Sequence, residues 1–449
     1  MKKGDTIYAP DKGLASIETL TSEYHELLSS ATIGYSAFLQ QGTLKGGVHG
    51  TWDDHDYGGN DYGDSMTRKR ERRNALLDFF QQSTHLAEPN GHGKGITSTY
   101  SKPRDINTPR ISSERYHRQG VYNSVTFGEP PHQVQVLFLD TRWARQNHCI
   151  PSLGTTGIPL GNILACLTRW ITAGLLPSTS TSTTHPNHQE GPPCLNNRVL
   201  DDMQWNWLEG QVLESKAQVH VVVSSIQVLT TNPVVESWGH FPKERTRLLS
   251  LLNRLEGGVI LLSGDVHHGE ILKTFDTQDE QEGPTRTSTN GGIMEVTSSG
   301  LTHSCSEPFY GRLCAPILDT FSSHRYKTGQ VDKGYFTGRN FGSIDIDWGK
   351  TNMGHSTENQ NIPSMKVNVH DHWGNLVLST GSHPLFQYSS HMSEKEIGNI
   401  PSCMDGHLIP ILSKAFGIFI WIVLILIYRM CCRKSEVVVQ TSVHVKKKV

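Results

Sequence analysis

Carboxylates and a histidine crowd into residues 51–63, which read Thr-Trp-Asp-Asp-His-Asp-Tyr-Gly-Gly-Asn-Asp-Tyr-Gly. Four acids and one histidine fall within the nine residues from Asp53 to Asp61, and no Lys or Arg lies between Gly46 and Met66. Like charges held close together raise one another's pKa, so such a cluster needs a positive partner. Because carboxylate, imidazole and amide oxygen are common metal ligands, the stretch predicts a divalent or trivalent metal ion.

The alternative is an ordinary polar turn, since Asp, Asn and Gly are frequent in loops. The spacing also lacks the alternating acids and the Glu at position twelve of a helix–loop–helix calcium site. Similar side chains elsewhere in the chain favour the metal. They follow predicted strands or lie near the chain start: Asp5 with Tyr8, Asp140 with Arg142, and Asp265 with His267.

Ligands in layered α/β folds gather at the carboxyl ends of strands. In an extended chain Asp265 and His267 point to the same side, so both can reach one metal pair. Asp5 could bridge two metals about 3.5–4 Å apart, as in two-metal hydrolases, and Tyr8 would favour a hard trivalent ion. His55 could then protonate a leaving oxygen. Each group alone is better explained as a turn, a solvated pair or an ion pair, but together they favour a hydrolytic site.

Hydrophobic periodicity predicts an α/β fold, a mixed β-sandwich covered by helices. Helices are expected over residues 17–39, 68–82, 201–217 and 243–255. Buried strands are expected at 134–139, 219–226, 259–262 and 293–296, and half-exposed antiparallel strands at 343–347, 365–370 and 376–379. Residues 147–198 contain a Ser/Thr run and are expected to form an insertion or linker, with 158–176 as a surface helix interrupted by Arg169.

Composition excludes an electrostatic case for nucleic acid, because the net charge of the 449 residues is −2. Eight cysteines are present, and six of them precede the apolar C-terminal segment. That even number is compatible with three disulfides of undetermined pairing, although Cys305 and Cys314 are close enough to clip one loop. Free buried thiols are the alternative.

A membrane span is predicted at residues 408–428, because 415–428 contain no charge and about 20 apolar residues cross a bilayer. Arg429, Arg433 and Lys434 follow, which places the tail 429–449 in the cytoplasm and residues 1–400 outside the cell or in a lumen, a single-pass type I arrangement. Residues 1–10 show no signal peptide. Asp5 lies almost at the chain start, so we expect a longer form that supplies a preceding strand and is the better enzyme.

Several segments resemble the alkaline phosphatase D family of metallophosphatases. They occur in that family's order, at residues 4–9, 51–61, 138–142, 204–209, 224–227, 238–242, 262–267 and 297–303. The resemblance covers residues 4 to about 310 and implies an αββα metallophosphatase fold over 1–400. It also implies phosphoesterase activity and two or more metal ions, iron and calcium by preference, with zinc or manganese as alternatives.

The resemblance further implies roles for single residues. Asp5 would bridge the metals, with Tyr8, Asp54, Asp265 and His267 as the other ligands. His55 would be the general acid, with Asn60 and Arg142 near the phosphate.

We therefore expect a membrane-anchored phosphomonoesterase that acts on phosphate esters. A phosphodiesterase or phospholipase-like hydrolase on the same site is one alternative. The other is a degenerate, non-catalytic binding protein, because the family's first metal-binding strand has no counterpart here.

Overall fold

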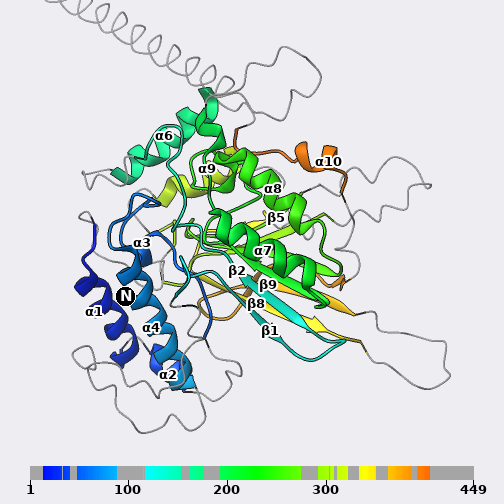
Figure 1. The fold of residues 1–449 in the computed structure, drawn as a ribbon, viewed down its shortest axis with the longest axis horizontal. Helices are drawn as coiled ribbons and strands as arrows, with labels where there is room; N and C mark the ends of the chain where they lie inside the picture. Colours follow the sequence, from blue (N-terminus) through cyan, green and yellow to red (C-terminus); the bar gives the residue numbers. More distant parts are fainter. Residues whose placement is uncertain are drawn as a thin grey trace, which may run out of the picture.

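Two β-sheets packed face to face form the centre of the molecule, with helices around them (Figure 1). The fold is mixed α/β, as the sequence predicts. The computed structural model describes residues 14–32, 34–40, 48–87, 115, 117–152, 161–175, 193–274, 292–302, 304–307, 311–321, 333–349, 363–385 and 392–404. Two of the proposed ligands, Asp5 and Tyr8, lie outside these residues, as do the predicted span 408–428 and the basic tail 429–449.

The larger sheet has seven strands in the order β1-β2-β3-β4-β6-β5-β7. Its central strands β2, β3, β4 and β6 are parallel, while β1, β5 and β7 pair antiparallel at the two sides. The strands are β1 (Asn123–Phe127), β2 (Val134–Phe138), β3 (Val219–Val223), β4 (Gly258–Ser263), β5 (Gly269–Lys273), β6 (Met294–Ser298) and β7 (Tyr335–Phe336). The carboxyl ends of the four parallel strands meet at one edge, where the sequence places its chemically active side chains.

The smaller sheet is antiparallel and has four strands. Strand β9 (Ser364–Asp371) lies at its centre and pairs with β8 (Asn340–Asp347) on one side and with β10 (Leu376–Ser379) and β11 (His383–Pro384) on the other. Among the described strands, β8 has no partner other than β9. The three period-two segments of the sequence are thus confirmed as antiparallel strands.

Alternation along the strands builds two cores. Inward side chains such as Val221, Ile260 and Val367 form the core between the sheets, while their neighbours Val222 and Leu261 face the helices. A strand with period two can serve two layers in this way. Among the described residues, no helix contributes to the core between the two sheets.

Helices α7 (Asp202–Glu214) and α8 (Pro242–Leu252) cover the outer face of the larger sheet (Figure 1). Asp201 caps α7, since its carboxylate accepts a hydrogen bond from Gln204 N at 2.8 Å. Its buried residues Trp205, Leu208 and Val212 recur at helical spacing and pack on the sheet. Both helices start and end within three residues of the predicted bounds.

A second helical group precedes the sheets: α1 (Ile17–Ser29), α2 (Tyr35–Leu39), the short α3 (Asp54–Tyr57) and α4 (Lys69–Ala87). The predicted single helix over 17–39 is wrong, because the chain turns at Gly34, whose φ is +75°. Trp52 and Tyr57 are fully buried in the core of this group, which therefore anchors the first half of the acidic stretch.

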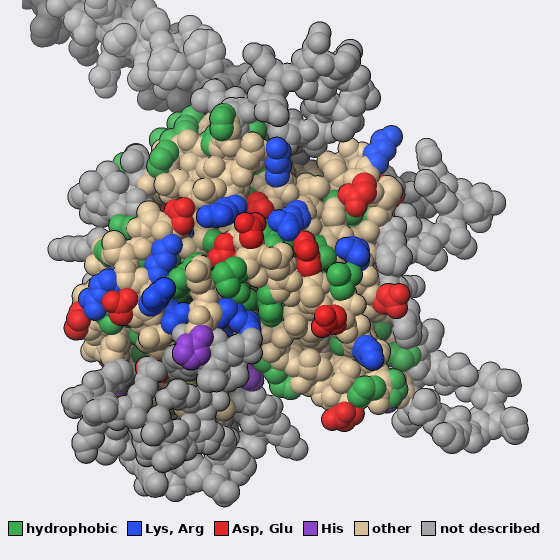
Figure 2. Space-filling model, viewed as in Figure 1, with side chains coloured by type: hydrophobic (Ala, Val, Ile, Leu, Met, Phe, Trp, Pro, Cys, Tyr) green, Lys and Arg blue, Asp and Glu red, His purple; other side chains and the backbone are tan. Residues whose placement is uncertain are grey.

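Helices α6 (Gly161–Leu175), α9 (Cys314–Phe321) and α10 (Glu394–Gly398) complete the described helices. Disulfide Cys149–Cys194 joins the ends of the predicted insertion, and Cys305–Cys314 clips the expected loop. Cys166 and Cys403 are not joined in a disulfide. Side chains over α6 are hydrophobic or uncharged (Figure 2). Among the described residues, no helix is long and apolar enough to cross a membrane.

Candidate metal centre

The acidic stretch is fastened to the end of β2 by its first residues. Thr51 Oγ1 donates a hydrogen bond to Leu139 O at 2.7 Å, and Trp52 Nε1 donates to Asp140 Oδ1 at 2.7 Å. Gly63 closes the other side, where a Cβ would lie 2.2 Å from Arg145 O. Only glycine fits there, so the loop is held between α3 and the segment that follows β2.

Asp140 has a structural role in the turn after β2. Its carboxylate accepts backbone N–H groups from Val121 at 2.8 Å and from Arg142 and Trp143 at 2.9 Å. Burial raises the pKa of Asp140, although these hydrogen bonds to the charged form oppose the rise. The turn directs the side chain of the next charged residue, Arg142, into the space between the strand ends.

Arg142 is fully buried and contacts three carboxylates. Its Nε lies 2.9 Å from Asp53 Oδ1, its Nη1 lies 2.8 Å from Glu236 Oε2, and its Nη2 lies 3.7 Å from Asp265 Oδ1. Burial alone would lower the Arg142 pKa, but the carboxylates of Asp53 and Glu236 raise it above its ordinary value. Arg142 therefore joins segments that lie far apart in sequence.

Two groups of three carboxylates meet around Arg142. Asp53, Asp54 and Asp265 form a first triad, and Asp54, Asp61 and Glu236 form a second triad. Within each triad, one oxygen of each side chain lies within 4.8 Å of the others. Asp54 belongs to both and is buried. The donors are carboxylate oxygens alone, which is the chemistry that hard cations such as calcium prefer.

Guanidinium groups compensate the second triad. Arg145 Nε lies 3.0 Å from Glu236 Oε1, and Arg169 Nη1 lies 2.7 Å from Asp61 Oδ2. Burial alone would raise the Glu236 pKa, but Arg142 and Arg145 hold it well below its ordinary value.

The first triad has less compensation. Burial raises the pKa of Asp265 well above its ordinary value, and the carboxylates of Asp53 and Asp54 raise it further. Burial also raises the pKa of Asp53 to about 6, although Arg142 opposes the shift.

The whole cluster carries excess negative charge when ionised. The five carboxylates of the two triads face three guanidinium groups, Arg142, Arg145 and Arg169, which leaves two negative charges with His55 neutral. One bound divalent cation would balance them. The residues present therefore fit a metal ion, and the first triad fits it best because the pKa values of two of its members, Asp53 and Asp265, are raised.

Two proposed ligands after β4 lie in a strained turn. Asp265 has a φ of 71° and His267 a φ of 58°, values that non-glycine residues seldom adopt. Such a backbone costs about 1–3 kcal/mol per residue and occurs mainly where the surroundings enforce it. Here His267 N donates to Ser299 Oγ at 3.1 Å, and Cys305 N donates to His267 O at 2.8 Å. The turn holds Asp265 in the first triad.

The structure brings together some predicted site residues and leaves another outside both triads. Asp54 and Asp265 share the first triad, and His55 Nε2 lies 3.9 Å from Asp54 Oδ1. Asn60 is half-buried in the same loop. His267 is in neither triad. The ligand, acid and phosphate-contacting roles of these residues stay predictions.

Sequence reasoning missed five participants: Asp53, Asp61, Arg145, Glu236 and Arg169. Asp53 and Asp61 belong to the acidic stretch 51–63, which the sequence singles out. The sequence therefore locates the loop, but it does not show which of its acids converge on one site. Glu236 precedes the Trp-Gly segment at 238–239 that carries the resemblance, and this nearness is the only signal for it. Arg169 interrupts an apolar segment, and a charge in such a position often has a buried partner.

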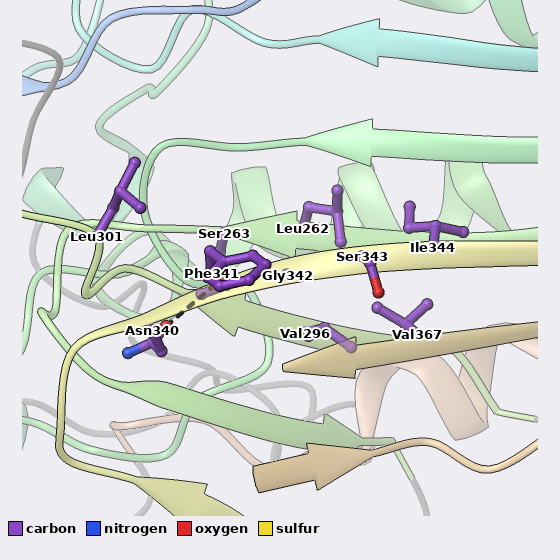
Figure 3. A pocket seen from close by; sticks show the side chains of 11 residues that line it. Leu262, Ser263, Val296, Leu301, Asn340, Phe341, Gly342, Ser343, Ile344 and Val367 are labelled. Atoms are coloured by element: carbon purple, nitrogen blue, oxygen red, sulfur yellow. Dashed lines mark hydrogen bonds between the residues drawn. The ribbon is translucent and has the colours of Figure 1, made fainter. Parts of the chain in front are cut away.

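A pocket of about 410 Å³ opens between the two sheets beside the strand ends (Figure 3). Its polar end includes Ser263, two residues before Asp265, and Ser298, whose hydroxyl donates to Asn340 Oδ1 at 3.0 Å. The rest of its lining is largely apolar: Leu262, Val296, Leu301, Phe341, Ile344 and Val367. An apolar hollow thus begins close to the acidic cluster.

Comparison with known proteins agrees with the resemblance seen in the sequence. The model of the PhoD-like phosphatase family matches residues 35–356. A solved structure titled "Structure of PhoD" is 16% identical with a TM-score of 0.34, and the match covers 77% of this chain and 57% of that one. No residue role follows from so distant a likeness, and no curated protein matches the chain. The family match spans both triads and most of the sandwich, and the chain belongs to the PhoD-like phosphatase family.

Proposed function

We propose that the chain is a metal-dependent phosphoric ester hydrolase, anchored in a membrane and acting mainly on phosphomonoesters. The observation that carries the proposal is the uncompensated negative charge of the two triads at the carboxyl ends of the parallel strands. In a purely structural network of ion pairs the positive and negative charges would balance. This cluster instead carries two excess negative charges, which is the charge that one divalent cation would neutralise. Family membership supports phosphate esters as the substrate class.

In this proposal Asp53, Asp54 and Asp265 hold the cation. When bound, such a cation supplies a water deprotonated near neutral pH and a positive charge next to the phosphoryl oxygens. The hard oxygen donors favour a hard cation such as calcium. Iron is the second ion that the family resemblance implies, with zinc or manganese as alternatives. The second triad, held by its guanidinium groups, keeps Asp54 in place from the other side.

Protein side chains would perform the remaining tasks. His55, whose Nε2 lies 3.9 Å from the Asp54 carboxylate, would donate the proton to the leaving oxygen. Asn60, in the same loop, would hydrogen-bond a phosphoryl oxygen. Arg142 would act through Asp53 and Asp265, because its guanidinium is enclosed by carboxylates.

Asp5 and Tyr8 are our candidate ligands for a second metal, and both lie outside the described residues. Ala15 N donates to Gly58 O at 2.7 Å, so the described chain begins beside the end of α3. Asp5 lies ten residues before Ala15, and Tyr8 lies seven residues before Ala15. An extended chain of seven residues spans roughly 23 Å, which is ample to return to the Asp54 carboxylate.

The membrane anchor is proposed from the apolar length of residues 408–428 and the basic residues that follow it. It would place the catalytic part outside the cell or in a lumen. The two disulfides of the described chain support an extracellular or lumenal location of the catalytic part, because disulfides persist mainly in oxidising compartments.

One assay separates the proposal from its alternatives. Metal content is measured on the full chain together with turnover of p-nitrophenyl phosphate and bis(p-nitrophenyl) phosphate. Bound metal with faster monoester hydrolysis supports the proposal, and faster diester hydrolysis supports the phosphodiesterase reading. Bound metal without turnover of either compound would instead indicate a non-catalytic binding protein.

A further inference from the structure

Helix α6 turns its charged residue inward and its apolar residues outward. Its 15 residues contain one charged side chain, Arg169, which is 7% exposed and lies against Asp61 and Val234 O. Ala165 and Thr172 share this buried side. A helix on the surface of a soluble domain normally shows the reverse pattern, with polar residues facing water.

The outward side of α6 carries an apolar stripe, which we define as Leu164, Leu167 and Ile171. Their spacing of three and four residues puts them on one face. Leu167 is 42% exposed, while Leu164 and Ile171 are half-buried. In Figure 2 the side chains over α6 are hydrophobic or uncharged. The stripe therefore suits an apolar environment better than water.

The chain leaves the described structure beside this helix. Cys403 and Met404 pack with Ala173 of α6 in one small apolar cluster, to which Cys149 adds a contact. Residue 408, where the proposed membrane span begins, follows Met404 by four residues. Four extended residues reach roughly 13 Å, so the span starts within about that distance of the cluster.

We propose that the apolar stripe of α6 rests on the surface of the lipid bilayer that residues 408–428 enter. This inference depends on the proposed anchor. The bilayer is favoured over packing of the span on α6 because 21 helical residues measure roughly 32 Å, whereas the 15 residues of α6 measure roughly 23 Å. The short segment between Met404 and residue 408 and the outward apolar stripe would together fix the orientation of the molecule relative to the bilayer.

This orientation places the acidic cluster close to the membrane. Arg169 leaves the inner side of α6 and contacts Asp61 of the second triad at 2.7 Å. A helix with its side chains is roughly 10–12 Å across. The cluster therefore lies about one helix thickness behind the stripe.

Spin labels on the full chain in phosphatidylcholine vesicles test the inference. Cys166, Cys431 and Cys432 are first replaced by serine, while Cys403, at 1% exposure, stays unlabelled. A nitroxide is attached to Leu167→Cys, or to Leu164→Cys as a second variant. The matched control is Leu213→Cys on α7, where the leucine is 59% exposed. Collision with oxygen and with a water-soluble nickel chelate reports depth, and flotation with the vesicles reports the anchor.

We expect the protein to float, and the nitroxide on α6 to meet oxygen more and nickel less than the nitroxide on α7. Flotation with equal nickel access at both positions would overturn the docking surface and leave the anchor intact. A nitroxide on α6 that is shielded from both oxygen and the nickel chelate would indicate that protein covers the stripe, and this result would overturn the proposed contact with the bilayer. Failure to float would overturn the anchor and the inference with it.

Discussion

Replacing Asp54 by asparagine removes one negative charge from the point where the two triads meet. Asp54 is 3% exposed, and its Oδ2 accepts a hydrogen bond from Asp61 N at 2.9 Å, which an amide oxygen can also accept. The loop should therefore keep its shape. A pair of unit charges 4 Å apart contributes about 4 kcal/mol at an effective dielectric constant of 20. Metal affinity should fall by about a thousandfold or more, since about 1.4 kcal/mol corresponds to a factor of ten.

Competition with a chelator of known affinity measures this loss, alongside turnover of p-nitrophenyl phosphate at a fixed metal concentration. Asp64→Asn is the control, because Asp64 lies in the same loop but outside both triads. We expect the control to keep metal affinity and turnover within about twofold, as surface substitutions usually do. Unchanged metal affinity in Asp54→Asn would refute the placement of the cation between the triads.

Three further outcomes are expected. Arg169→Met should destabilise the protein by about 3–5 kcal/mol, because it strands the buried Asp61 carboxylate, and the double variant with Asp61→Asn should recover much of this in urea unfolding. Metal-free protein should lose stability as the pH rises from about 4 to about 6, because the folded-state pKa of Asp53, about 6, lies above its unfolded value and folding then favours the protonated form. Metal-loaded protein should not show this loss in urea unfolding, and equal pH profiles with and without metal would contradict the assignment. Protease outside intact cells should remove the body and spare a C-terminal tag, and digestion of that tag without permeabilisation would contradict the topology.

Local patterns predicted most of the framework. Strands such as β4 and β9 alternate or form apolar runs between turns, and α7 has a cap and an apolar face, so their positions follow from periodicity. The break between α1 and α2 was missed because the hydrophobic spacing continues across it, although Gly34 permits the left-handed turn that separates them.

The site was predictable only in part, because its contacts join distant segments. The Trp-Asp-Asp-His stretch reveals carboxylates in need of a cation, but Arg142 meets Asp53 and Glu236 across 89 and 94 residues. Arg169 reaches Asp61 across 108 residues. Hydrophobic periodicity indicates which side of a helix is buried, but it does not indicate which charged residue from another segment packs against that side. The partner of Arg169 therefore could not be read from the sequence.

Metal content of the full chain tests the central claim most directly. The protein is equilibrated with calcium and iron, passed through a desalting column, and its metal-to-protein ratio is measured by mass spectrometry. The charge balance of the two triads predicts at least one ion per chain, lost on chelation together with phosphatase turnover. A chain that retains no metal after equilibration, or that hydrolyses p-nitrophenyl phosphate equally well after chelation, would contradict the account.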